Sequence, residues 1–513
     1  VASKRFLITI GDRTVGGLDH RDQMVGPWQV PVADVAVTLS DYTGLAGQAM
    51  ASGERMPLAA VDAPASGRMA VGEALTNLLA APVELPRVKL SANWMAACGE
   101  EGEDAALYDT VRAVAMELCP ALGISIPVGK DSLSMRTRWT DADGAEKQVT
   151  SPVSLVVSAF ASLDSVAGTW TPQLMPGSEL VLVDLGAGKN RLGGSMLAQV
   201  SGQFGDQVPD LDDPARLVSL AAALGELRTE GLVTSYHDRS DGGLWAAVCE
   251  MAFAGASGVR LDVADVEALF SEELGVVLGI DPARRDRVLE VLASHGLGEL
   301  SAVVGRTGED RRVQVVDLLD EDLRDLAQAW DEVSWRIAAL RDNPECADSE
   351  HDAFGADAPG LVVEPSFDPT DDVAAPYLAS GVRPKVVILR EQGVNSHVET
   401  AFAFDRAGFD VYDVHMTDLQ AGRFDLSDAV GLVACGGFSY GDTLGAGEGW
   451  ARSVLFNPRL TEMFSTFFAR EDSFGLGICN GCQMFGALAG IIPGADAWPR
   501  FTRNRSEQFE ARL

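Results

Sequence analysis

Cysteine is scarce in this sequence, with seven in 513 residues, and the number is odd. Only Cys479 and Cys482 lie close together, in the stretch "GLGICNGCQMFGALAG" at 475–490. This usage argues against a disulfide framework of the kind that holds small secreted domains together, and a reducing compartment fits best. We therefore expect a cytoplasmic protein.

Basic residues are also few, because 40 Lys and Arg stand against 75 Asp and Glu, which gives a formal charge of -35 and a pI near 4.4. Such a balance argues against broad binding of nucleic acid phosphates, so no nucleic acid partner is expected. The first residues, "VASKRFLITIGDR", lack the basic start and long apolar segment of a signal peptide. Since they also lack an initiator Met, we expect the chain to begin within a longer protein.

Charge is absent from residues 473–495, a stretch that is nominally long enough to span a bilayer. Asn480 and Gln483 lie at its centre among many glycines, and Pro493 interrupts its end. A buried strand, turn and helix is therefore expected there, and no membrane partner.

The length predicts about three or four domains. From residue 1 to about 340, apolar runs such as "RFLITIGD", "SLVVSAFASL" and "ELVLVDLG" alternate with helix-like stretches such as "GRMAVGEALTNLLAA" and "YDTVRAVAMELCPALG". This is an α/β pattern. The turn-rich "TPQLMPGSE" at 171–179 predicts two subdomains, 1–170 and 171–340.

Residues 341–383 are rich in Asp, Pro, Ala and Gly without clear periodicity, which predicts an extended linker. A new domain is expected over 384–513. Its runs "PKVVILREQG", "NSHVETAFAFDRAGF", "VGLVACGGFS" and "FGLGICNGCQMFGALAG" read as strand, helix, strand and strand-turn-helix. That order is typical of a doubly wound parallel sheet.

The "CNGC" stretch admits several interpretations. A structural zinc site needs four Cys or His ligands, and no second pair or His cluster accompanies Cys479 and Cys482. A redox pair has this spacing, but here it lies deep in the chain. Two buried structural cysteines are a further alternative. We favour a nucleophile elbow, framed by Gly477 and Gly481, in which the positive end of the following helix favours the thiolate of Cys479 and Cys482 packs on that helix.

A second glycine turn supports this interpretation. "CGGFSYGD" at 435–442 also follows an apolar strand. Backbone N–H groups around Gly437 and Phe438, together with the N–H of Asn480, are expected to face a developing oxyanion. Two such turns at neighbouring strand ends suit acyl transfer.

From about residue 384 onward, "PKVVILREQGVNSHVE", "ACGGFSYGDTLGAGEGWA" and "LGICNGCQM" resemble the class I glutamine amidotransferase domain of the phosphoribosylformylglycinamidine synthase family. The resemblance implies that Cys479 attacks the amide of glutamine and releases ammonia through a glutamyl thioester. In that family a histidine and a carboxylate C-terminal to the elbow complete the triad.

The six histidines of this sequence, at 20, 237, 295, 351, 397 and 415, all precede Cys479. We therefore expect the triad partners to lie beyond this chain, and this portion alone to lack full glutaminase activity. His397 and His415 are interpreted as local helix and loop residues.

The N-terminal zone carries oxygen donors on separate segments. Asp34 precedes a strand, Glu73 and Asn77 lie four apart on one helix face, and Asp238 and Ser240 occupy a turn in "HDRSDGGL". Hard oxygen donors are what Mg²⁺ bound to nucleotide phosphates requires. Taken singly, the pair at 73 and 77 is as consistent with a solvated helix face, and Asp238 or Asp241 with helix caps.

Taken together, these segments resemble the aminoimidazole ribonucleotide synthetase-like (PurM-like) ATP-binding fold that the same family carries twice, and "KLSANWMAA" and "IPVGKDSLSM" match its second half. The resemblance implies magnesium ligands at Asp34, Glu73, Asn77 and Asp238, and contacts of Lys4 and Ser240 with ATP or ADP. It also implies that the catalytic first half is absent and that the nucleotide site here is auxiliary. His237, Lys130 and Asp131 are interpreted as turn formers and cavity liners.

The family reaction is the ATP- and glutamine-dependent amidation of formylglycinamide ribonucleotide to formylglycinamidine ribonucleotide in purine biosynthesis, a ligase reaction. Two alternatives remain open. The chain is a nucleotide-stabilised structural portion without its own catalysis, or it is another ATP-using enzyme of the same fold, such as a selenophosphate or thiamine-phosphate kinase relative. The latter is disfavoured because those relatives lack a fused cysteine-bearing domain.

Overall fold

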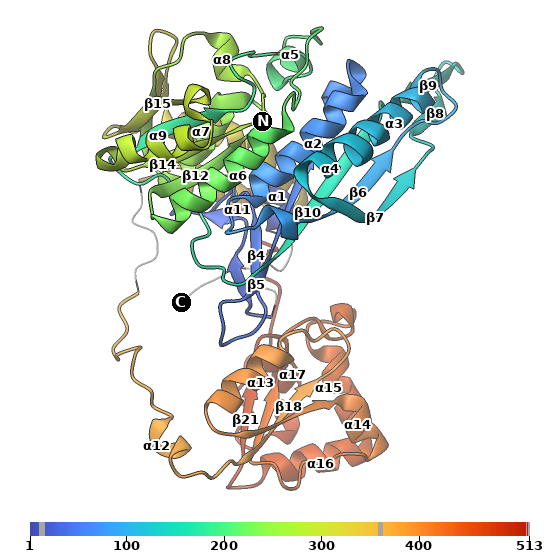
Figure 1. Ribbon diagram of the computed structural model, residues 1–513. Helices are drawn as coiled ribbons and strands as arrows, with labels where there is room; N and C mark the ends of the chain where they lie inside the picture. The colour runs from blue at the N-terminus through green and yellow to red at the C-terminus, as the bar shows by residue number, and fades with distance from the viewer. Residues whose placement is uncertain (10–15, 358–362, 509, 511–513) are drawn as a thin grey trace. The chain divides into compact units, whose positions relative to one another are not determined.

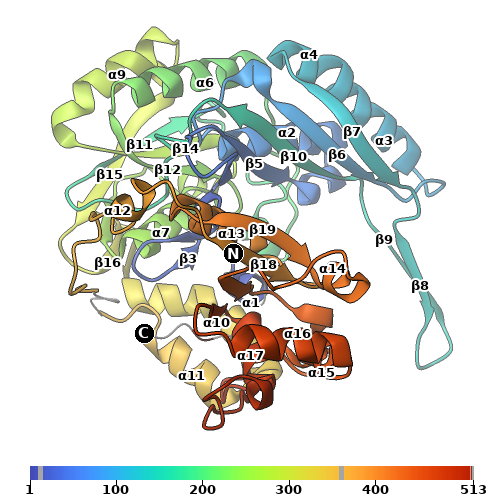
Figure 2. The ribbon, with the colours of Figure 1, turned by 90° about the horizontal axis from the view of Figure 1, so that it is seen from below.

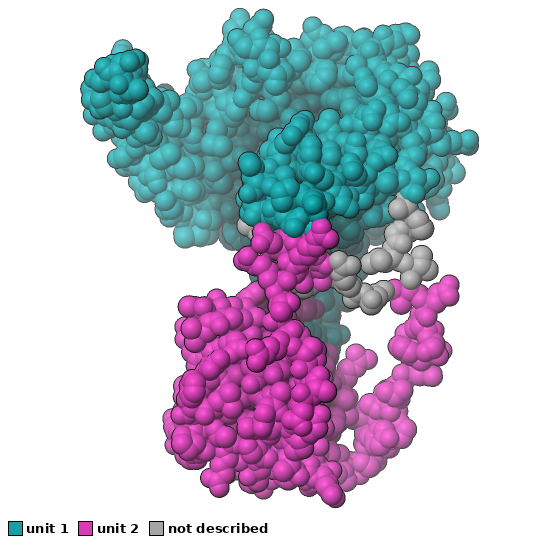
Figure 3. Space-filling view, turned by 180° about the vertical axis from the view of Figure 1, so that it is seen from behind, with its two compact units in different colours: residues 1–13, 18–361 teal, residues 14–17, 362–513 magenta. Residues whose placement is uncertain are grey.

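The computed structural model describes residues 1–9, 16–357, 363–508 and 510 (Figure 1). The chain forms two compact units, residues 1–13 with 18–361 and residues 14–17 with 362–513, coloured separately in Figure 3. Each unit is described by itself. In the described part of the chain, no helix combines the length and apolarity needed to cross a bilayer.

The first sheet of unit 1 has six strands, and its central pairs β5–β10 and β10–β6 are antiparallel. The alternation in β5, "GQAMASGE", buries every second side chain, as expected for a sheet with one face on a core. Its order is β1 (Asp19–Arg21), β4 (Ala36–Leu39), β5 (Gly47–Glu54), β10 (Ser154–Leu163), β6 (Lys89–Met95) and β7 (Ser125–Ser132).

The second sheet of unit 1 is buried on both faces. Along β14, "GVVLGI", Val276 and Leu278 contribute to one apolar core while Val277 contributes to another, because successive side chains point to opposite faces. Its order is β12 (Val233–Arg239), β14 (Gly275–Ile280), β11 (Glu179–Asp184), β15 (Ser301–Gly308), β13 (Gly258–Leu261), β16 (Arg312–Val315) and β17 (Leu319–Asp322).

Two hairpins stand outside these sheets: β2 (Met24–Val25) with β3 (Val30–Pro31), and β8 (Arg136–Thr140) with β9 (Glu146–Thr150). Figures 1 and 2 both show the β8–β9 hairpin projecting from the first sheet. The helices of unit 1 are α1 (Arg5–Ile8), α2 (Ala63–Leu78), α3 (Glu103–Val111), α4 (Cys119–Leu122), α5 (Met196–Val200), α6 (Pro214–Thr229), α7 (Gly243–Gly255), α8 (Val266–Phe270), α9 (Arg285–Ser294), α10 (Leu323–Arg341) and α11 (Pro344–Ala353).

Unit 2 contains a four-stranded, fully parallel sheet with helices between its strands. Val387 and Leu389 of the central strand β18 (Lys385–Arg390) join one core and Val386 and Ile388 the other, as a doubly wound sheet requires. The remaining elements are α12 (Ala375–Leu378), α13 (His397–Arg406), β19 (Asp410–His415), α14 (Met416–Ala421), β20 (Gly431–Ala434), α15 (Glu448–Leu455), α16 (Pro458–Phe468), β21 (Phe474–Gly477) and α17 (Asn480–Ala487).

The structure confirms the predicted α/β class and the doubly wound sheet, but two local expectations are wrong. Arg5–Ile8, expected within a strand, forms α1, because the guanidinium of Arg5 is buried against Asp331 of α10 and holds this segment on a helix. Residues 10–12 of the same run lie outside the described residues. The expected extended linker contains α11, capped by Asn343 and packed on α10. The subdomain boundary at 170 stays a prediction.

Candidate functional site

A buried acidic cluster lies beside the second sheet of unit 1. Asp34, in the loop between β3 and β4, and His237 and Asp238, on β12, each offer one ligand atom within 4.8 Å of the others. The Asp34 Oδ1 atom is 2.8 Å from His237 Nδ1 and accepts the N–H of Asp238 at 2.9 Å. Two of the four predicted metal ligands, Asp34 and Asp238, are thus brought together.

Two carboxylate oxygens of the cluster are available to a cation. Asp34 Oδ2 and Asp238 Oδ2 are buried and make no hydrogen bond within the described part of the chain. Burial, reinforced by the negative charge of Asp34, raises the pKa of Asp238 well above its usual range. Unpartnered buried oxygens of this kind are destabilising, and hard oxygen donors are the ligands that Mg²⁺ prefers, so the residues fit such an ion.

His237 lies between two carboxylates, since Nδ1 contacts Asp34 and Nε2 is 3.1 Å from Glu250 Oε2. Burial alone would lower the pKa of His237, but the attraction and hydrogen bonds of Asp34 and Glu250 outweigh it and raise that pKa well above its usual range. Both ring nitrogens face carboxylate oxygens, an arrangement that favours the doubly protonated ring. The sequence interpretation of His237 as a turn former missed these contacts. His237 lies on strand β12, where it and its neighbour Asp238 would normally point to opposite faces.

Glu73 and Asn77 share one face of α2, as predicted, but neither belongs to the three-residue cluster. Glu73 Oε2 accepts the N–H of Glu54 at 2.6 Å, and Asn77 Nδ2 donates to the carbonyl of Ser52 at 3.3 Å, so both bind strand β5. Burial raises the pKa of Glu73 to about 7 despite the nearby Arg55 guanidinium. Their role as magnesium ligands stays a prediction.

The two predicted nucleotide contacts, Lys4 and Ser240, lie on different segments of unit 1. Lys4 is exposed immediately before α1, while Ser240 is half-buried directly after β12. The backbone N–H of the neighbouring Ser3 donates to the carbonyl of Trp330 at 2.9 Å, and Trp330 Nε1 donates to Glu250 at 3.0 Å. Since Glu250 also contacts His237, this chain of bonds connects the N-terminal segment to the cluster.

Four polar residues differ from the local positions that the sequence suggested for them. Asp238 and Asp241 do not cap α7, whose N-cap is Gly242 without a side-chain hydrogen bond, and Asp241 instead lies 3.5 Å from Arg55. Lys130 and Asp131 lie on strand β7 rather than in a turn, and they line a cleft of about 400 Å³ beside Trp94, which confirms the expectation of cavity liners.

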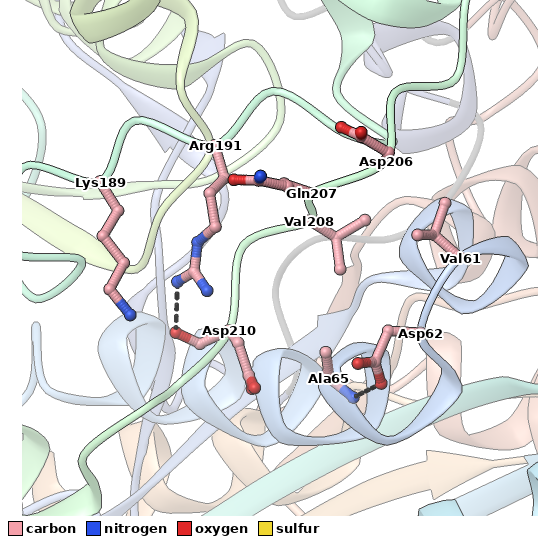
Figure 4. Close-up of a pocket in the computed structure, with 9 residues that line it drawn as sticks. All are labelled: Val61, Asp62, Ala65, Lys189, Arg191, Asp206, Gln207, Val208 and Asp210. Carbon is pink, nitrogen blue, oxygen red and sulfur yellow. Dashed lines mark hydrogen bonds between the residues drawn. The ribbon is translucent and has the colours of Figure 1, made fainter.

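A second cleft of unit 1, of about 460 Å³, is lined by none of the residues predicted from sequence (Figure 4). Arg191 enters it from above, but its guanidinium is held by Glu273 and Asp212, and Lys189 is paired with Asp212 at 2.9 Å. Because its cations are already compensated by protein carboxylates, we assign no ligand to it. Its lining consists of Val61, Asp62, Ala65, Lys189, Arg191, Asp206, Gln207, Val208 and Asp210.

In unit 2, Cys479 joins strand β21 to helix α17 and adopts φ 49° and ψ -110°, a conformation that is unfavourable for any residue except glycine. Its side chain is exposed. A Cβ at Gly477 would lie 2.7 Å from the Cα of Cys482, and one at Gly481 would lie 2.0 Å from the carbonyl oxygen of Ala434, so only glycine fits at either position. These are the features of the predicted elbow. Cys482, expected to pack on the helix, is exposed instead.

The second glycine turn touches the elbow. A Cβ at Gly436 would lie 3.2 Å from that of Cys479, and the next residue, Gly437, has φ 135°. The N–H of Phe438 donates to the carbonyl of Gly393 at 2.9 Å, so this amide is not free to meet an oxyanion, contrary to expectation. Within the described residues, the amides of Gly437 and Asn480 have no recorded acceptor and remain candidates for that role.

The histidines of unit 2 have local positions. His415 caps α14, because its Nδ1 accepts the N–H of Thr417 at 3.2 Å, and its Nε2 is 3.5 Å from Glu391. His397 begins α13, and its Nδ1 is buried without a partner in the described part. Within the described residues, neither imidazole ring makes a hydrogen bond to Cys479.

Comparisons with known proteins match three domain families along the chain. Residues 3–162 match the FGAR-AT PurM_N-like domain, residues 175–318 the AIR synthase related protein C-terminal domain, and residues 383–513 the CobB/CobQ-like glutamine amidotransferase domain. The chain is therefore a mixed α/β protein with PurM-like domains followed by a glutamine amidotransferase domain. In particular, this set of domains supports a relation to PurL-like, FGAR amidotransferase proteins.

Solved structures with a similar fold share little sequence with this chain. They include PurLQS from Thermotoga maritima (16% identity, TM-score 0.42, 62% of this chain and 48% of the other) and phosphoribosylformylglycinamidine synthase II from the same organism (16%, 0.44, 80% and 55%). HypE of E. coli, a hydrogenase maturation protein, is also similar (19%, 0.39, 54% and 84%). The chain spans about half the length of the Thermotoga relatives.

Proposed function

We propose that this chain is the second PurM-like half and the glutaminase domain of a cytoplasmic phosphoribosylformylglycinamidine synthase. The enzyme converts formylglycinamide ribonucleotide to formylglycinamidine ribonucleotide with ATP and glutamine, a step of purine biosynthesis. The observation that carries the proposal is the strained, exposed Cys479 elbow on a doubly wound domain that shares one chain with PurM-like domains. The missing first half of the polypeptide supplies the site for the ribonucleotide.

At the elbow, the thiolate of Cys479 attacks the carboxamide carbon of glutamine, and the carbonyl oxygen becomes an oxyanion. The amides of Gly437 and Asn480 donate to that oxygen, since neither has an acceptor among the described residues and both turns meet at Gly436. The amide nitrogen of the adduct takes up one proton and leaves as ammonia, and the adduct collapses to a glutamyl thioester. Water then releases glutamate and regenerates the thiol. The histidine and carboxylate that complete the triad are assigned to residues outside this chain.

In unit 1, Asp34 and Asp238 present their free oxygens to Mg²⁺, with Glu73 and Asn77 as further ligands from α2. A magnesium ion held there would supply positive charge opposite the phosphates of ATP or ADP, and Lys4 and Ser240 would contact that nucleotide. One oxygen of Asp34 is already engaged by His237 and by a backbone N–H, an arrangement that holds the cluster in place. This favours a nucleotide that stabilises the fold over one that is turned over.

Covalent trapping tests the glutaminase proposal. The full-length polypeptide, incubated with [¹⁴C]glutamine and quenched in acid, should retain label on the peptide that contains Cys479. Cys479→Ala should abolish the label, whereas Cys482→Ala, the matched control three residues away, should keep it. Label that survives Cys479→Ala, or that is absent from the unaltered protein, contradicts the assignment.

Gel filtration tests the nucleotide site. ADP and Mg²⁺ should elute with the unaltered protein and be lost after chelation and with Asp238→Asn. An exposed acid on helix α9, Asp286, provides the control, since Asp286→Asn should retain both. Retention of the nucleotide by Asp238→Asn would remove the metal cluster from the proposal. Retained nucleotide without any trapped thioester would instead favour the purely structural alternative.

A further inference from the structure

The side chain of Asn480 is buried to 1% exposure although it directly follows the exposed nucleophile. Its Oδ1 accepts two hydrogen bonds from Ser439, from the backbone N–H at 3.2 Å and from the hydroxyl at 2.6 Å. Its Nδ2 donates to Asp442 at 3.0 Å and to Gln483 at 3.3 Å. One carboxamide thus joins the elbow to residues 439–442 on the neighbouring glycine turn.

That neighbouring turn needs such a connection because its backbone is strained. Tyr440 and Asp442 both have φ 53°, and Gly437 has φ 135°. Residues other than glycine rarely adopt such φ angles, and these angles persist only where surrounding contacts fix the backbone. The turn is held on one side by the bond from Phe438 N–H to the carbonyl of Gly393, and on the other by the Asn480 carboxamide.

Gly437 directly precedes the two anchored residues Phe438 and Ser439, and its amide has no acceptor among the described residues. The second such donor is the backbone N–H of Asn480 itself. We infer that the Asn480 side chain is a positioning group that fixes the spacing between these two N–H donors, so that both reach the same oxyanion. This inference rests on the proposed glutaminase function.

The chemistry of the contacts explains why asparagine occupies this position. The site requires an acceptor for Ser439 and a donor for Asp442 on a side chain of this length. Aspartate keeps the acceptor but cannot donate, and it sets two carboxylates against each other. Alanine leaves the buried Ser439 hydroxyl without this acceptor.

The test compares two reactions of the same thiol in the full-length polypeptide. Thioester formation from saturating [¹⁴C]glutamine needs the oxyanion donors, whereas alkylation of Cys479 by iodoacetamide does not. Asn480→Asp should slow thioester formation about tenfold or more, since loss of a whole donor costs about 10²–10³ in rate. The glutamine concentration for half-maximal rate and the alkylation rate should stay within about twofold of the unaltered protein, because the donors act on the transition state.

Two further variants keep the test decisive if Asn480→Asp folds poorly. Ser439→Ala removes one partner of the carboxamide and should give a smaller loss of the same kind. Thr461→Val removes a hydroxyl of α16 that donates to the carbonyl of Val454 on α15 at 2.9 Å, outside both turns, and should leave both reactions unchanged. Undiminished thioester formation in Asn480→Asp and Ser439→Ala, or an equal loss of alkylation, overturns the positioning role. Absence of thioester in the unaltered protein refutes the glutaminase function itself, which separates the two failures.

Discussion

The backbone at Cys479 leads to a prediction about stability. With φ 49° and ψ -110°, this non-glycine residue is held in a conformation that costs about 1–3 kcal/mol. Replacing it by glycine removes that strain, and because the side chain is exposed, little packing is lost. The greater freedom of glycine in the unfolded chain offsets about 0.5–1 kcal/mol. We therefore expect Cys479→Gly to stabilise unit 2 by about 0.5–2 kcal/mol while abolishing glutamine chemistry.

The buried thiol of Cys435 provides a measurement specific to unit 2. Burial raises the pKa of Cys435 to about 11, so the thiol reacts with a maleimide only when the unit opens. Its labelling, read by mass spectrometry, should be about 2- to 30-fold slower in Cys479→Gly, since 1.4 kcal/mol corresponds to a factor of ten. The backbone conformation that exposes the nucleophile thus lowers the stability of unit 2.

Two controls separate strain from loss of the thiol. Cys479→Ala removes the sulfur but keeps the unfavourable angles, and Cys435 should be labelled at the rate seen in the unaltered protein. Cys482→Gly places glycine in the first turn of α17, where no strain is relieved, and should speed labelling about twofold. Equal rates in Cys479→Gly and Cys479→Ala would refute the argument from backbone strain.

Two further substitutions test packing in the two units. Gly481→Ala places a Cβ 2.0 Å from the carbonyl oxygen of Ala434, and should destabilise unit 2 by about 1–3 kcal/mol or more and prevent thioester trapping. Both this variant and a control are measured by urea titration. In the control, Gly490→Ala, the added Cβ meets nothing within 4 Å, so the change in stability should be close to zero. Asp331→Leu leaves the buried Arg5 without the carboxylate that accepts its Nε–H at 3.0 Å, and should cost unit 1 about 3 kcal/mol in the same titration. A neutral result for either Gly481→Ala or Asp331→Leu would contradict the packing described here.

Local patterns predicted much of the fold because they act over short distances. The apolar run at 385–390 and the glycine turn at 475–482 formed the predicted strand and elbow, since sheet burial and close backbone approach permit few alternatives. Residues 344–353 were missed as a helix. Their order depends on α10, which lies earlier in the sequence, and a local pattern does not contain that contact.

In the candidate sites, too, features set by residues close in sequence were predictable and features set by distant residues were not. The elbow is contiguous in sequence, and the pairing of Glu73 with Asn77 follows from helix geometry, so both were predictable. The contact of His237 with Asp34 joins residues 203 positions apart and was not. Likewise, the amide of Phe438 donates to the carbonyl of Gly393, which lies on a segment that no pattern near residue 438 reveals.

The two candidate sites differ in what compensates for their unfavourable free energy. This difference predicts how ligands change the stability of each unit. In unit 2 the strain at Cys479 is offset by the protein itself, whereas in unit 1 the buried Oδ2 atoms of Asp34 and Asp238 have no hydrogen-bond partner among the described residues. Mg²⁺ with ADP should therefore stabilise unit 1 alone, by about 2.7 kcal/mol at one hundred times the dissociation constant.

Two buried thiols report this effect separately. Burial raises the pKa of Cys249 in unit 1, as it does for Cys435 in unit 2, so each reacts only when its own unit opens. Saturation with Mg²⁺ and ADP should slow labelling of Cys249 about 100-fold and leave Cys435 unchanged. The protection should disappear with Asp238→Asn. Equal protection of both thiols would mean that the ligand acts elsewhere, and no protection of Cys249 would mean that the free oxygens of the cluster do not hold a metal–nucleotide complex.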